Sequence, residues 1–380
     1  MDNLVEWHFL LLNDRARVAA YERAIAAAVK PGDVVLDLGA GTGVMGLLAC
    51  RAGASRVYAI EGGGMAEIVR RIARANGLAD RIVCLHGDSM EVELPERVDL
   101  AIADQTGPFG IGGGLFEIFN DARRRFLKPH GMTIPSRIDL SVGLAECPEL
   151  WAPVEFWDER RLGFDMSAMH EVARNVGYEI HFTRAELLSE PACVLSFNFA
   201  ASTAEASSGI ATLTALRPGT LHGLFGCFQA ELVPGVSISN SPLGPGTISR
   251  RAWFMPIERP VALEAGDSVG VTVHMIPAEG MATWKVEVTG CDGAVKAKST
   301  HSTFKGALIA KYEDLRKMRP DYVPRLSARG ETERAILDLC DGTRSVRQIA
   351  QEVHLRFPES FRSPAEAGVA VSRIIGRNTQ

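Results

Sequence analysis

The chain has 380 residues, of which 46% are hydrophobic and 23% charged, a profile typical of a globular protein with two or three domains. Its formal net charge is −5 at pH 7 and it contains no basic run, so we expect no nucleic-acid partner. Its longest apolar stretches are far shorter than the roughly 20 residues of a membrane span, and its first residues lack the pattern of a secretory signal, so we expect no membrane partner.

The seven cysteines are scattered along the chain and form no Cys-x-x-Cys pair. An odd, unclustered set of this kind is typical of reduced thiols and not of a disulfide framework or a zinc site. The sequence therefore predicts a cytoplasmic location and no metal.

The first 140 residues alternate between helical and strand patterns. Helices are predicted over residues 14–29, 44–51, 65–76 and 116–126, and strands over 34–38, 56–61, 82–85 and 100–103. Strands that alternate with helices favour a parallel sheet covered on both faces, which is an α/β fold.

From about residue 140 to 310 the pattern becomes that of short strands between turns rich in glycine, proline, serine and asparagine. Strands are predicted over residues 192–199, 223–233, 268–275 and 281–288, with a helical, aromatic-rich exception over 151–174. This part predicts an all-β sandwich or barrel. Three short amphipathic helices follow, over residues 332–339, 345–353 and 364–375.

A glycine-rich turn lies between the first predicted strand and the helix that follows it. It contains Asp37, Gly39, Gly41 and Gly43, and Glu61 ends the next strand. Glycines allow a tight turn and a close approach of the backbone to a ligand. A carboxylate at the end of the second strand, where Glu61 lies, can accept hydrogen bonds from both hydroxyl groups of a ribose. The two features together predict a nucleoside-binding site.

The spacing Gly-x-Gly-x-Gly after an acid resembles the S-adenosylmethionine (SAM) site of class I methyltransferases. That resemblance implies SAM as the cofactor and places Asp88 and Ser89, which follow the third strand, beside the adenine. The alternatives are a nicotinamide-dependent dehydrogenase, a glycine turn without a ligand, and, for Asp88, a turn-capping role.

A second resemblance extends over residues 8 to about 300 and is to protein arginine methyltransferases. It depends on the spacing of His8, Asp14, Arg17 and Tyr21, and on the stretches 127–135, 163–167 and 221–222. The resemblance implies a Rossmann-type SAM-binding domain over residues 1–138 and a β-barrel domain over 139–310. It further implies a helical arm, at about 150–185, through which a homodimer forms. In this family the arginine that matches Arg17 pairs with the SAM carboxylate.

The chain departs from that family where the acceptor binds. The family holds a guanidinium between two glutamates; Asp104 occupies the first position, the second falls near Gly113, and Glu117 substitutes only if the loop takes another route. The family's Thr-His-Trp loop aligns with Thr247-Ile248-Ser249, which keeps only the threonine. These losses argue against arginine as the acceptor. Asp104 is then expected to orient or deprotonate an acceptor amine or hydroxyl, and Gln105 to hydrogen-bond it.

Residues 335–350 resemble the helical part of PqqD-like domains, which bind leader peptides of ribosomally made, modified peptides. We therefore predict a small helical domain over residues 311–380. The leading hypothesis is SAM-dependent N- or O-methylation of a peptide or peptide-derived natural product. The alternatives are a small-molecule methyltransferase with a structural tail, a protein arginine methyltransferase, and a SAM-binding scaffold without catalysis.

Overall fold

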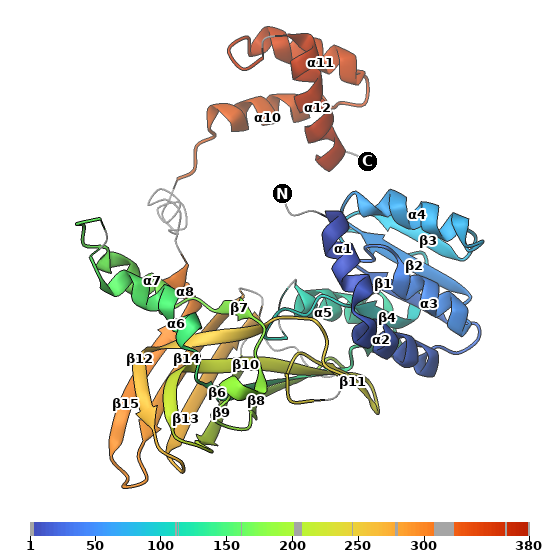
Figure 1. Ribbon diagram of the computed structural model, residues 1–380. Helices are drawn as coiled ribbons and strands as arrows, with labels where there is room; N and C mark the ends of the chain where they lie inside the picture. The colour runs from blue at the N-terminus through green and yellow to red at the C-terminus, as the bar shows by residue number, and fades with distance from the viewer. Residues whose placement is uncertain are drawn as a thin grey trace. The chain divides into compact units, whose positions relative to one another are not determined.

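The computed structural model describes residues 4–110, 112, 114–160, 162–200, 207–244, 246–277, 280–307, 323–361 and 363–378. The chain divides into two compact units, Met1–Leu308 and Ile309–Gln380 (Figure 1).

The first unit opens with two helices and a parallel sheet whose strands alternate with helices. The elements are α1 (Leu4–Asn13), α2 (Arg15–Ala28), β1 (Val34–Leu38), α3 (Val44–Ala52), β2 (Arg56–Glu61), α4 (Met65–Ala75), β3 (Ile82–His86), β4 (Val98–Ala103), α5 (Leu115–Arg125) and β5 (Leu127–Ile134). The strand order is β3-β2-β1-β4-β5 and every neighbouring pair is parallel. The predicted α/β fold is confirmed.

The centre of this sheet explains the apolar pattern of its first strand. β1 pairs with β2 on one side and with β4 on the other, and all five of its residues are buried. The chain passes from β1 first toward β2 and β3 and later back to β4, so the order of the strands reverses at β1. Open parallel sheets bind ligands at the carboxyl ends of the strands at such a reversal. The glycine-rich turn lies at this position.

The rest of the first unit is built from antiparallel sheets. Its elements are β6 (Arg137–Ala145), α6 (Pro148–Glu155), α7 (His170–Ala173), β7 (Tyr178–Ile180), β8 (Ala192–Asn198), β9 (Ser207–Thr214), β10 (Gly219–Val233), β11 (Val236–Ser239), β12 (Ala252–Leu263), β13 (Ser268–Ile276), β14 (Met281–Thr289), β15 (Val295–Ser302) and α8 (Thr303–Gly306). One sheet has the order β7-β12-β10-β6-β8, with β11 on β10; the other has the order β15-β14-β13-β9. The predicted all-β region is confirmed.

The prediction from sequence named β8, β10, β13 and β14 as examples of the short strands and did not name the others. β12 is the clearest case, because it contains Pro256 and Pro260, which argue against a strand inside a sheet. Its pairing with β10 changes register between Leu221 and Gly223. The strand therefore accommodates the prolines at an irregularity of the ladder.

The predicted helical stretch 151–174 is broken into short pieces. α6 is followed by 3₁₀ turns at Phe156–Asp158 and Ser167–Met169 and then by α7. Arg174, after α7, is buried and donates to Asp158 at 2.8 Å and to Glu258 of β12 at 3.3 Å. These contacts fasten the base of the segment to the antiparallel sheet. Its tip exposes Leu162 and Phe164.

The described part of the second unit, residues 323–361 and 363–378, contains three helices, as predicted: α10 (Ala328–Asp338), α11 (Val346–Arg356) and α12 (Pro364–Asn378). They share a core of their own, in which Ile336, Val353, Ala367 and Val371 are fully buried. Ser345 caps α11 in a capping box with Gln348, which fixes where that helix begins. Within the described ranges, no helix is long and apolar enough to cross a membrane.

Domain boundaries other than the one between the two units remain a proposal. We propose that the parallel-sheet domain ends at residue 138 and the barrel domain at residue 310, because β5 ends at Ile134 and β6, which pairs with β8 and β10, begins at Arg137. The small helical domain would then span residues 311–380.

Candidate functional site

The glycine-rich turn has the backbone geometry that only glycine adopts easily. Gly39, Gly41 and Gly43 have φ angles of 68°, 56° and 76°, all in the left-handed region. The turn is also crowded, because a Cβ at Gly41 would lie 2.7 Å from Cε1 of His8. A side chain at Gly41 would therefore collide with His8 of α1, which packs against the turn.

Asp37 lies beneath this turn and not on its surface. The side chain is buried, and its Oδ2 accepts a hydrogen bond of 3.0 Å from the backbone N–H of Gly46 in α3. Burial raises the pKa of Asp37 from its usual 3.8 to about 7, and the nearby charge of Glu61 acts in the same direction. In this geometry the side chain supports the turn and the first part of α3.

Glu61 ends β2 with its carboxylate against the glycine-rich turn. Oε2 accepts from the N–H of Gly41 and Oε1 from the N–H of Gly63, both at 2.8 Å. The side chain remains partly exposed. A carboxylate at this place can accept from neighbouring hydroxyl groups, which is the chemistry of ribose recognition.

Asp88 and Ser89 follow β3 at the same edge of the sheet. Asp88 is exposed, and its Oδ1 accepts from the N–H of Met90 at 2.9 Å, the contact of a capped turn. The carbonyl of Ser89 accepts from Arg125 of α5 at 2.5 Å. The turn-capping alternative for Asp88 thus has a contact in the structure, while the backbone of Ser89 is fixed to α5.

Arg17 and Asp104 form an ion pair, with side chains only 6% and 8% exposed. The Tyr21 hydroxyl donates to Oδ1 of Asp104 at 3.1 Å, and Nη1 of Arg17 donates to the carbonyl of Leu11 at 2.7 Å. Burial lowers the pKa of Arg17 and raises that of Tyr21 to about 12. The sequence assigned Arg17 to the cofactor and Asp104 to the acceptor; the structure brings the two together.

The rest of the loop after β4 is described in part. The amide of Gln105 lies over Gly39, so it reaches the glycine-rich turn. Gly113 lies outside the described residues. Glu117 is in the first turn of α5, and a Cβ at Gly114 would lie 3.8 Å from its Oε2. No contact between described residues joins Glu117 to Asp104, so the structure leaves a second clamp carboxylate without support.

The segment Thr247-Ile248-Ser249 of the barrel closes on the amino-terminal helices. The hydroxyl of Thr247 donates to carbonyls within its own turn, and Ile248 is buried. The N–H of Ser249 donates to Oδ2 of Asp14, the N-cap of α2, at 2.7 Å. The barrel segment therefore forms one wall of the site through its backbone.

Arg250 is the site residue that the sequence reasoning missed. Its guanidinium donates to the carbonyl of Thr106, two residues after Asp104. Burial lowers the pKa of Arg250, and the charge of Arg250 in turn helps to lower the pKa of Arg17. The only signal in the sequence was its place directly after the Thr247-Ile248-Ser249 segment.

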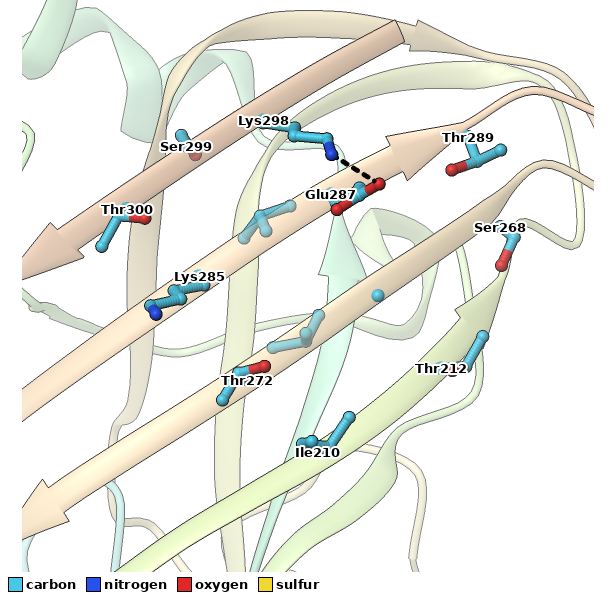
Figure 2. A pocket seen from close by; sticks show the side chains of 13 residues that line it. Ile210, Thr212, Ser268, Thr272, Lys285, Glu287, Thr289, Lys298, Ser299 and Thr300 are labelled. Carbon is cyan, nitrogen blue, oxygen red and sulfur yellow. Dashed lines mark ion pairs between the residues drawn. The ribbon is translucent and has the colours of Figure 1, made fainter. Parts of the chain in front are cut away.

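A shallow groove of about 570 Å³ lies on the outer face of the four-stranded sheet. Figure 2 shows the side chains that line it. Threonine, serine and lysine side chains line it, and Lys298 pairs with Glu287 at 3.0 Å. None of the predicted site residues lies there. We assign this groove no part in the chemistry.

Comparisons with known proteins agree with the geometry. The family of ribosomal protein L11 methyltransferases (PrmA) matches residues 19–138. Arginine N(omega)-methyltransferase of Streptomyces achromogenes subsp. streptozoticus is 30% identical over 276 residues, covering 71% of this chain and 76% of that protein. Probable protein arginine N-methyltransferase 6.1 of Oryza sativa subsp. indica is 32% identical over 269 residues, covering 67% and 71%.

Two solved structures share the fold. A chain of the Trypanosoma brucei PRMT1 enzyme-prozyme heterotetrameric complex with AdoHcy has a TM-score of 0.69 and 21% identity, covering 78% of this chain and 97% of that chain. Arabidopsis thaliana protein arginine methyltransferase 10, solved in an open conformation, has a TM-score of 0.67 and 20% identity, covering 77% and 96%. Both confirm a parallel-sheet domain followed by a barrel.

Fold and site together define a class I SAM-dependent methyltransferase. Within that class, the chain belongs to the arginine N-methyltransferase family. The residues present fit the cofactor, since the glycine-rich turn presents backbone without side chains at the carboxyl end of β1 and Glu61 offers a carboxylate at the carboxyl end of β2. The predicted enzyme class and cofactor are confirmed. The individual site residues and the PqqD-like resemblance of the tail stay predictions.

Proposed function

We propose that the protein transfers a methyl group from SAM to a nitrogen of an arginine guanidinium. The observation that carries this proposal is the ion pair of Asp104. At the carboxyl end of β4, the Asp104 carboxylate already binds a guanidinium, which is that of Arg17. Carboxylates and guanidinium groups match in geometry and charge. The names of the relatives support the same acceptor. This proposal replaces the expectation that arginine is not the acceptor.

The roles of the cofactor-binding residues follow from their places in the fold. We propose that Glu61 accepts from the ribose, that Asp88 and Ser89 lie beside the adenine, and that Arg17 pairs with the cofactor carboxylate. Gly39, Gly41 and Gly43 would let the backbone of the turn lie close to the cofactor, and Asp37 fixes the turn to α3 through its hydrogen bond with Gly46.

When bound, SAM supplies an electrophilic methyl group on a sulfonium. A guanidinium nitrogen forms the new N–C bond, the sulfur keeps the electron pair of the broken S–C bond, and the nitrogen loses one proton. Asp104 is the group we propose to orient that nitrogen and to accept the proton, and Gln105 to hydrogen-bond the acceptor. For this, Asp104 exchanges the guanidinium of Arg17 for that of the acceptor.

The test uses methyl-labelled SAM with the purified full chain. L-arginine, agmatine and a short arginine-containing peptide are offered separately, with L-lysine and a matched lysine peptide as controls. We expect label on at least one guanidine compound and none on the lysine compounds. Labelling of a host peptide that contains no arginine, with all guanidine compounds unlabelled, would overturn the proposal.

A second candidate is N- or O-methylation of a peptide or peptide-derived natural product. It is favoured by the C-terminal helices, whose core is separate from that of the first unit, as a peptide-binding module requires. If the helices recruit a peptide, deletion of residues 323–380 abolishes turnover of that peptide and spares small acceptors. Equal loss of both would remove this candidate, and SAM binding without any turnover would favour a scaffold.

We propose that the protein is a homodimer formed through the segment at 150–185. The tip of that segment exposes Leu162 at 94% and Phe164 at 67%, and apolar side chains presented in this way are typical of association surfaces. We further propose a cytoplasmic location, which is supported by the free state of all seven cysteines. Replacing Leu162 and Phe164 with serine should yield a monomer in sedimentation experiments if the arm forms the dimer.

A further inference from the structure

Arg250 is a charged side chain in a confined place without a carboxylate partner. Within the described ranges, no carboxylate lies at ion-pair distance from its guanidinium, and its hydrogen bond is to a neutral carbonyl, that of Thr106. A guanidinium has five N–H donors in a rigid fork, so one carbonyl leaves most of them available. Burying a cation without an anion is unfavourable, and burial here lowers the pKa of Arg250.

The nearby carboxylates of Asp14 and Glu179 do not form an ion pair with Arg250. Asp14 and Glu179 raise the pKa of Arg250 from a distance. Asp14, however, accepts backbone hydrogen bonds with both of its oxygens, from Arg17 at 3.1 Å and from Ser249 at 2.7 Å. Glu179 is an exposed residue of β7. Arg250 therefore differs from Arg17, which is paired with Asp104.

The position of Arg250 indicates which ligand carries the missing anion. It comes from the segment between β11 and β12, and it donates to the loop that carries Asp104, the residue proposed for the acceptor. Two residues of chain, from Asp104 to Thr106, span at most about 7 Å. That span is comparable with the length of an arginine side chain. A molecule with a guanidinium at one end and a carboxylate at the other would satisfy both side chains.

We propose that Arg250 binds the α-carboxylate of the acceptor, so that the enzyme acts on free L-arginine, or on a small arginine derivative that keeps its carboxylate, in preference to arginine inside a protein. This inference depends on the proposed guanidinium N-methylation and specifies its substrate. Asp104 holds one end of the acceptor and Arg250 the other. The pair between Arg250 and the α-carboxylate then determines specificity, because an arginine inside a polypeptide has a peptide bond in place of that carboxylate.

The experiment compares acceptors that differ only at the carboxylate. Methyl transfer from labelled SAM is measured with L-arginine, with L-argininamide, whose carboxylate is neutralised, and with agmatine, which lacks it. The wild-type enzyme should show a kcat/KM for L-arginine at least about 10-fold higher than for the other two, the size expected for a charged hydrogen-bonded pair. This comparison uses only the wild-type enzyme, so its result does not depend on whether a variant folds.

The variants locate the effect. Arg250→Ala should lower kcat/KM for L-arginine by about 10- to 100-fold, mainly through KM, and change agmatine by less than about 3-fold. Arg250→Lys should keep part of the preference. Arg251→Ala is the matched control, because Arg251 is the adjacent, exposed arginine whose described contact is made by its backbone carbonyl. It should leave the preference unchanged.

Three outcomes would overturn the inference. Equal methylation of L-arginine, L-argininamide and agmatine by the wild-type enzyme would leave guanidinium methylation intact and remove the role of Arg250. A loss in Arg250→Ala that is the same for all acceptors, or that arises from weaker SAM binding in calorimetry, would make Arg250 a support of the loop or a cofactor residue. Failure of every guanidine compound, with SAM bound, would instead contradict the proposed function itself.

Discussion

Arg17 and Asp104, far apart in the sequence, form a buried ion pair that joins α2 to the carboxyl end of β4. Tyr21 donates to the second oxygen of Asp104, so the carboxylate is engaged on both sides. The pair places the residue proposed for the cofactor against the residue proposed for the acceptor. It follows that binding at one position changes the partners available at the other.

Replacing Asp104 with asparagine removes the charge but keeps the shape. We expect kcat/KM for the acceptor to fall at least about 100-fold, because the amide neither pairs with a guanidinium nor takes its proton. Arg17 would also be left as a buried charge without a partner, which destabilises the fold by about 3 kcal/mol. Methyl transfer and chemical denaturation measure the two effects.

The matched control for this variant is Asp88→Asn, an exposed acid at the same edge of the sheet. It should leave stability within about 0.5 kcal/mol of the wild type, as is usual for surface positions. Retention of full turnover by Asp104→Asn, in a variant shown to be folded, would contradict the role of Asp104.

Changes in the turn should remove SAM binding and leave the fold intact. Gly41→Asp forces a side chain into a left-handed backbone position and against His8, and Glu61→Ala removes the carboxylate proposed for the ribose. We expect affinity for SAM in calorimetry to fall at least about 10-fold in each. Gly77→Ala is the matched control, because Gly77 has φ of 67° but no atom within 4 Å of its Cβ position. Normal SAM binding by Glu61→Ala would show that this assignment is wrong.

The sequence predicted the turn and the parallel sheet because both depend on local patterns. Gly39, Gly41 and Gly43 adopt the left-handed conformations that their spacing suggested, and Glu61 lies against them as expected. The pair of Arg17 with Asp104 could not be predicted, because it depends on how α2 packs against the end of β4. Long-range packing of this kind leaves no periodic signal.

Arg250 was missed for the same reason. The sequence of its neighbours Thr247 to Ser249 indicates only a degraded family motif, whereas the structure shows contacts of Arg250 with Thr106 and of Ser249 with Asp14. The strand β12, which follows Arg250, contains two prolines, and these argue against a strand when only the sequence is known. A segment without a predicted element gives no basis for placing its side chains.

The stability of the barrel should depend on one tryptophan that connects its two sheets. Trp284 of β14 is fully buried, and its Nε1–H donates to the carbonyl of Pro256 in β12 at 2.8 Å, which joins the sheets. Trp284→Phe removes this hydrogen bond and leaves a cavity, so we expect a loss of about 2–3 kcal/mol in the free energy of unfolding. Trp7→Phe, at a side chain that is 53% exposed, should change it by less than about 0.5 kcal/mol. Equal effects of the two substitutions in denaturant titrations would refute the proposed role of the contact.

Asp37 should make the stability of the protein depend on pH. Its pKa is raised from 3.8 to about 7, so the folded state keeps its proton over a range in which the unfolded state has lost it. The contribution of the protonated carboxyl is therefore complete below about pH 4 and is lost as the pH rises toward 7, at no more than about 1.4 kcal/mol per pH unit. Above that range it is constant.

Asp37→Asn removes this dependence and retains an oxygen that can accept from Gly46. Relative to the wild type, the free energy of unfolding of the variant should rise by about 2 kcal/mol between pH 5 and pH 7 and then stay level. Asp267 is a contrast of opposite sign, because Lys296 lowers its pKa to about 2, so its contribution is present above pH 4 and lost in acid. Denaturant titrations of the wild type and of Asp37→Asn at pH 5, 6, 7 and 8 measure this difference. A difference between Asp37→Asn and wild type that does not change across this range would show that the Asp37 carboxyl is ionised in the folded protein throughout, and that the turn, not burial, sets its charge.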